Sequence, residues 1–188
     1  MTFEYPPSSN EHYNFIIELA PLDLVPHAIH LFLEQVEHGL WNDTSFYLIG
    51  DHVIQGGPTI SREEVEIHKT RSSMYAFHEM DLDTLSFPEY SAEYPHTEWT
   101  VGFAGRPGGP DIYINLENNT EIHGPGGQHQ HALSEYGDAC FGKIVLGREF
   151  IERYLYYHEI YDDGSDWELY YKEPVAITGA VVLNGNNQ

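Results

Sequence analysis

The 188-residue sequence contains a single cysteine, Cys140, and only 8 lysines and arginines against 30 aspartates and glutamates. One cysteine excludes an intrachain disulfide framework, and its apolar neighbours favour a buried, inert thiol over a nucleophile. The formal net charge of -22 disfavours nucleic acids and anionic membranes as partners, because both are negatively charged. A cationic partner for the acidic surface stays open, and so does the alternative that the charge serves solubility.

Long hydrophobic runs are also missing. No stretch approaches the roughly 20 apolar residues of a membrane-spanning helix, so we expect no membrane insertion. The first residues lack the basic and apolar segments of a signal peptide. Two Asn-x-Thr triplets, at Asn42 and Asn118, hint weakly at a secretory compartment, although such triplets also arise by chance. The compartment is therefore left undetermined.

Short runs of β-branched and aromatic residues dominate what is present. Hydrophobic residues make up 41% of the chain, with 14 Tyr, 9 Phe and 3 Trp, and the length suits one domain. We expect residues 13–183 to form this domain, between a flexible arm at 1–12 and a polar tail at 184–188. Strands are predicted at 13–19, 45–49, 52–55, 100–104, 112–116, 140–145 and 175–183.

Two helices are predicted among these strands. The first begins at Pro26 and carries an apolar stripe at i, i+3, i+4 and i+7 from Ile29 to Val36, before Gly39 ends it. The second covers residues 148–156. Many short strands with two helices favour a barrel or sandwich over a parallel α/β sheet.

These pieces, in this order, resemble the cyclophilin family of peptidyl-prolyl isomerases. The motifs that carry the resemblance are Phe15–Leu19, Gln55-Gly56-Gly57, Thr100–Gly105, Ile112-Tyr113-Ile114 and Phe141-Gly142-Lys143. The resemblance covers residues 13–183. It implies a mainly β fold, a closed eight-stranded antiparallel barrel capped by two α-helices. It implies no cofactor.

The resemblance also implies a function, the binding of proline-containing peptide segments and the cis-trans isomerisation of their prolyl bonds. The barrier to that reaction, about 20 kcal/mol, comes from amide resonance, and a cation directed at the prolyl nitrogen weakens it. The family places an arginine two residues after a phenylalanine for this task. Here that position, counted from Phe46, is Leu48, so isomerase activity is expected to be reduced or lost.

Several other positions of the implied peptide groove are altered. His52 stands where the family has phenylalanine, Asp111 where it has glutamine, and Asp138 where it has histidine, while Leu133 is nearest to its tryptophan. Arg106, in a neighbouring loop, is the candidate surrogate for the missing arginine. The peptide-binding positions carried over are Leu48, His52, Val53, Gln55, Phe103, Ala104, Asp111, Tyr113, Leu133 and Asp138.

A histidine-rich segment lies between Ile114 and Phe141 and is about twice as long as in the family. Its His123, His129 and His131, with nearby carboxylates, form a candidate metal site, although the spacing matches no standard zinc motif and a solvent-exposed polar loop is the alternative. Two functions other than isomerisation therefore stay open. They are a non-catalytic acidic interaction scaffold and metal binding through residues 121–138.

Overall fold

The computed structural model describes residues 1–4, 12–42, 44–58, 74–128, 135–157, 159–161 and 168–183. Its strands form one ten-stranded sheet in which the pairings are antiparallel. The strands are β1 (Thr2–Glu4), β2 (His12–Asn14), β3 (Ile16–Leu19), β4 (Thr44–Gly50), β5 (Val53–Gly57), β6 (Thr100–Phe103), β7 (Ile112–Asn115), β8 (Cys140–Leu146), β9 (Ile160–Tyr161) and β10 (Glu168–Gly179).

The first and last strands in the order of the sheet are neighbours in the sequence. Its order is β2-β1-β10-β4-β5-β7-β6-β8-β3, with β9 paired to β10. The two ends of this order, β2 and β3, are neighbours in the chain and are separated only by Phe15. The mainly β architecture expected from the sequence is confirmed.

The N-terminal residues differ from the flexible arm that the sequence suggested. Thr2–Glu4 pair with β2, and Thr2 and Phe3 also pair with β10. The Met1 amino group donates to the Phe15 carbonyl at 2.9 Å, and the Phe15 N–H donates to the Met1 carbonyl at 3.1 Å. The expected first strand is divided at Phe15 into β2 and β3, so the described residues contain more strands than the eight expected. Residues 5–11 lie outside the described part.

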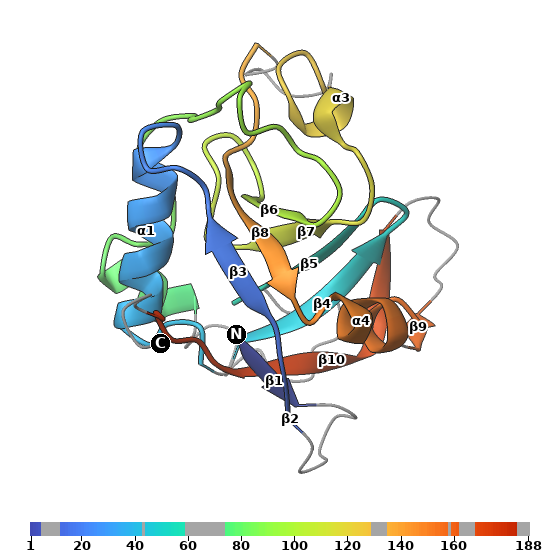
Figure 1. Ribbon diagram of the computed structural model, residues 1–188. Helices are drawn as coiled ribbons and strands as arrows, with labels where there is room; N and C mark the ends of the chain where they lie inside the picture. The colour runs from blue at the N-terminus through green and yellow to red at the C-terminus, as the bar shows by residue number, and fades with distance from the viewer. Residues whose placement is uncertain are drawn as a thin grey trace.

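Helices flank the sheet. Helix α1 (Pro26–Glu37) starts at the predicted proline and buries the predicted stripe, including Ile29, Phe32 and Val36. The predicted second helix is α4 (Arg148–Phe150) continued by the π-helix η1 (Ile151–Leu155). Figure 1 shows α1 and α4 on opposite sides of the sheet. The short helix α3 (Thr120–His123) lies in the histidine-rich segment, which the sequence left irregular, and residues 74–79 are also helical.

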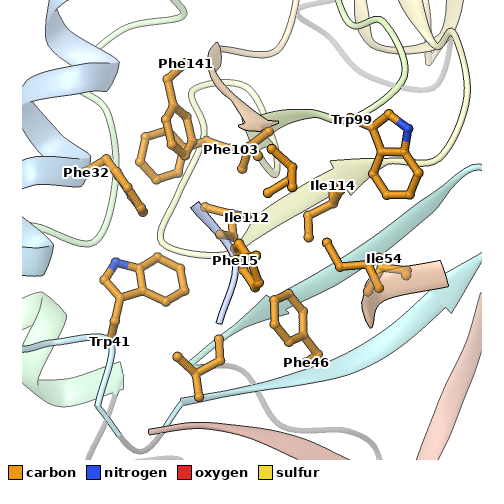
Figure 2. Packing of buried hydrophobic residues seen from close by; sticks show 14 of the residues in the cluster. Phe15, Phe32, Trp41, Phe46, Ile54, Trp99, Phe103, Ile112, Ile114 and Phe141 are labelled. Atoms are coloured by element: carbon orange, nitrogen blue, oxygen red, sulfur yellow. The ribbon is translucent and has the colours of Figure 1, made fainter. Parts of the chain in front are cut away.

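An aromatic core fills the inside of the sheet. The Phe141 ring lies 4.6 Å from the Phe32 ring and 4.7 Å from the Phe103 ring, and Figure 2 shows these side chains gathered with Trp41 and Phe46. Phe103 is fully buried in this core, and its expected contact with a peptide stays a prediction. Side chains alternate along a strand, and the outward position on β6 belongs to its neighbour Gly102.

Truncation of this core should destabilise the fold strongly. Phe141→Ala removes a fully buried ring, and we expect it to lower the free energy of unfolding by about 3–5 kcal/mol, measured by urea denaturation. Val145→Ala on the same strand is the matched control, because Val145 is 45% exposed, and it should have little effect. Equal losses for the two variants would contradict this assignment of the core.

Candidate functional site

Three of the predicted peptide-binding residues form one row on the outer face of the sheet. Leu48 pairs with Gln55 across β4 and β5, Gln55 pairs with Tyr113 across β5 and β7, and Tyr113 pairs with Gly102 across β7 and β6. A Cβ atom at Gly102 would lie 2.8 Å from the Tyr113 ring. Glycine at this position therefore leaves the outer surface of β6 free for the tyrosine.

A β-bulge in β4 brings a residue to this face that the sequence interpretation missed. The pairing with β5 shifts between Phe46 and Leu48, so an extra residue, Tyr47, accompanies Leu48. The Tyr47 hydroxyl accepts a hydrogen bond from Gln55 Nε2 at 2.6 Å and donates one to Asp111 Oδ2 at 2.9 Å. Burial, followed by the charge of Asp111, raises the pKa of Tyr47 far above its ordinary value. The phenol is therefore neutral.

Arg106 is buried and fully engaged. Its side chain is 1% exposed, and Nε donates to Asp138 Oδ1 at 2.5 Å. Nη1 donates to the Gly127 carbonyl at 3.1 Å, and Nη2 donates to the carbonyls of His123 at 3.1 Å and Gly124 at 3.2 Å. In this arrangement the guanidinium holds the histidine-rich segment.

Asp138 is the centre of the buried polar cluster. Its Oδ2 accepts hydrogen bonds from His123 Nδ1 at 2.8 Å, from the Tyr113 hydroxyl at 3.2 Å and from Gln128 Nε2 at 3.2 Å. Burial alone would raise the pKa of the Asp138 carboxyl, but the hydrogen bonds and positive charges of His123 and Arg106 outweigh burial and hold that pKa below its usual range. Asp138 is therefore an anion inside the protein.

The imidazole of His123 covers Tyr113. The two rings are stacked with centroids 4.3 Å apart, and the His123 ring lies 5.4 Å from that of His52 and 5.5 Å from that of His96. His123 is 6% exposed. Its Nε2 has no hydrogen-bond partner in the part of the chain that the structure describes. A histidine expected as a metal ligand thus lies among predicted peptide-binding residues.

His96 closes the cluster from the loop before β6, and sequence reasoning did not find it. It is fully buried, its Nε2 donates to the Asp138 carbonyl at 3.0 Å, and its Nδ1 lies 3.3 Å from the Tyr113 hydroxyl. Burial, followed by the charge of His123, lowers the pKa of His96 to about 4. His96 is therefore neutral at physiological pH.

The remaining predicted site residues are partly placed. Val53 is buried on β5 opposite Asn115, and the Ala104 N–H donates to the Asp111 carbonyl at 2.9 Å. Leu133, His129 and His131 lie outside the described residues. Among the residues described, no group of three or more His, Cys, Asp or Glu side chains is arranged to hold a metal ion. The metal site that includes the two undescribed histidines stays a prediction.

A comparison with protein families matches residues 8–162 to the model described as "Cyclophilin type peptidyl-prolyl cis-trans isomerase/CLD". The chain belongs to the cyclophilin-type peptidyl-prolyl isomerase family. The matched residues include the strands and loops that form the site. No curated protein matches the sequence, and no helix in the described ranges is long and apolar enough to cross a membrane.

Solved cyclophilins share the fold. A cyclophilin-type peptidyl-prolyl isomerase of Cryptosporidium parvum matches with a TM-score of 0.57 at 16% identity, over 88% of each chain. A second structure of that protein, determined in the presence of the dipeptide Ala-Pro, matches with a TM-score of 0.52 at 16% identity, over 88% of this chain and 93% of that chain. The predicted cyclophilin-like fold is confirmed, and the low identity fits a divergent member of the family.

Breaking the buried ion pair of this cyclophilin should cost more than removing a surface charge. Asp138→Asn leaves the Arg106 guanidinium buried without its counter-charge, and we expect the free energy of unfolding to fall by about 3–5 kcal/mol. Asp83→Asn is the control, because Asp83 pairs with the largely exposed His78, and such pairs contribute about 0–1 kcal/mol. Chemical denaturation measures both. If Asp138→Asn lowered the free energy of unfolding by less than Asp83→Asn, the buried Arg106 would not need Asp138 as its counter-charge.

His96 should make stability depend on pH. The pKa of a histidine in the unfolded chain is near 6.5, whereas burial lowers the pKa of His96 in the folded protein to about 4. Its contribution is therefore complete above the unfolded value and is lost as pH falls toward 4. Between about pH 7.5 and pH 5, wild type should lose about 2 kcal/mol more stability than His96→Gln, which does not titrate. Parallel pH profiles for the two proteins would contradict this prediction.

Proposed function

We propose that this cyclophilin-type domain binds proline-containing segments beside Tyr113 and isomerises them slowly or not at all. The observation that carries the proposal is the neutral row of Tyr47, Leu48 and Gln55, where the family's arginine is expected. Leu48 has no donor and no charge, and the Tyr47 hydroxyl already donates to Asp111. A preorganised charge directed at the reacting atom is what the reaction needs.

The bonds of Arg106, the candidate replacement for the missing arginine, also support slow or absent isomerisation. The Arg106 guanidinium donates to Asp138 and to three backbone carbonyls. Moving it toward a substrate would break those bonds and leave Asp138 buried without its counter-charge, which is costly. Reduced catalysis therefore follows from where this cation is used, as well as from the substitution at Leu48.

Peptide recognition is supported by family membership and by the residues retained at the site. Tyr113, Gln55 and Val53 occupy neighbouring outward positions on β7 and β5. The C. parvum isomerase with the same fold was crystallised in the presence of Ala-Pro. A ring on the outer face of β7 is a suitable apolar surface for a prolyl ring.

A non-catalytic interaction scaffold is the second candidate. It is favoured by the imidazole of His123, which covers Tyr113, and by the net charge of -22, which suits a cationic protein partner. In that case peptides with proline would leave the resonances of Tyr113 and His52 unchanged in NMR titrations. Binding of a cationic partner would then perturb other surfaces.

The isomerase assay distinguishes reduced from ordinary catalysis. Exchange spectroscopy on several Xaa-Pro peptides should give a kcat/KM about 100-fold or more below that of the C. parvum cyclophilin measured alongside, because one missing directed charge costs about 10²–10³ in rate. Leu48→Arg should raise turnover, whereas Leu48→Met, which is similar in size and uncharged, should not. Wild-type turnover equal to that of the C. parvum enzyme would contradict the proposal.

A further inference from the structure

We infer that His123 is a tethered occupant of the prolyl position, so that a peptide binds only after the imidazole leaves Tyr113. This inference rests on the proposed function and concerns the regulation of the same site. The stacked rings of His123 and Tyr113, 4.3 Å apart, leave no space for a third ring between them. A prolyl ring and the His123 ring therefore compete for one face of Tyr113.

The segment that carries His123 is fastened through its backbone. The carbonyls of His123, Gly124 and Gly127 accept hydrogen bonds from Arg106, and the Asp138 N–H donates to the His123 carbonyl at 2.8 Å. None of these bonds uses the imidazole. The backbone can therefore stay in place while the side chain of His123 rotates.

The turn at residues 124–127 also favours the position in which the His123 ring covers Tyr113. A Cβ atom at Gly124 would lie 2.2 Å from the Thr120 carbonyl oxygen, and one at Gly127 would lie 2.0 Å from the Ile122 carbonyl oxygen. Larger residues at these two positions would force the backbone to shift. The sequence of the turn thus permits the tight packing that brings His123 over the sheet.

The imidazole is held less completely than its backbone. Its Nδ1 lies 2.8 Å from Asp138 Oδ2 and 2.9 Å from Gln128 Nε2. Its buried Nε2, however, has no partner among the described residues, and a buried polar atom without a hydrogen bond costs free energy. Proline has no N–H to satisfy. A prolyl ring on Tyr113 would remove this unsatisfied nitrogen from the site, so an incoming segment can displace the side chain.

Two substitutions at one position test the inference. His123→Ala and His123→Leu both lose the hydrogen bond to Asp138, but only leucine keeps a side chain of similar bulk over Tyr113. Binding of an Ala-Ala-Pro-Ala peptide is measured by NMR titration of the full chain, with Ala-Ala-Ala-Ala as the control peptide. We expect the Kd of His123→Ala to be at least about tenfold lower than that of wild type, because in this variant no imidazole covers Tyr113 and the binding-competent state is more populated. His123→Leu should stay close to wild type.

The outcomes separate this inference from the proposed function. Equal Kd values for wild type and both variants would overturn the tethered occupant and leave the proposed function intact. If none of the folded proteins binds the proline peptide, the proposed function fails and the inference fails with it. Circular dichroism establishes that each variant is folded.

A second measurement uses only the wild-type protein. With ¹³C-labelled histidine, the His123 Cε1–H resonance should be shifted upfield in the free protein by the Tyr113 ring, and it should move toward the positions of exposed histidines as the peptide saturates. A resonance that keeps its position while the peptide binds beside Tyr113 would overturn the inference, even if the variants at position 123 failed to fold.

Discussion

The buried ion pair between Arg106 and Asp138 is the interaction on which the rest of the site depends. Its two side chains are each 1% exposed, and removing two charges from water is costly unless their hydrogen-bonding groups are satisfied. The carbonyls of the segment 123–127 and the side chains of His123, Tyr113 and Gln128 supply those partners. The pair therefore joins the loop between β6 and β7 to the segment between β7 and β8, over the outer face of β7.

This arrangement shows that membership of the family and the side chains present at the site are separate questions. The chain has the cyclophilin-like fold, while Arg106 holds the segment 123–127 and the row along β4 and β5 is neutral. A fold does not by itself establish an activity, which depends on the particular side chains at the site. The same segment places the His123 imidazole against the Tyr113 ring.

Much of the fold could be predicted because its signals are local. The apolar stripe from Ile29 to Val36 predicted α1, and Gln55-Gly56-Gly57 placed β5. What the sequence missed also has a local cause. Tyr47 was missed because a β-bulge adds a residue without changing the composition of the strand.

The sequence by itself determined the family and the order of most strands and helices, and it predicted that Leu48 replaces the family's arginine, since these depend on periodicity and on motifs of a few residues. Only the tertiary structure decided what Arg106 and His123 do. Arg106 meets Asp138 across 32 positions, and His96 meets the Asp138 carbonyl across 42. These residues lie in loops, where no periodic pattern indicates which way a side chain faces, so their partners are decided only when the folded sheet brings the loops together.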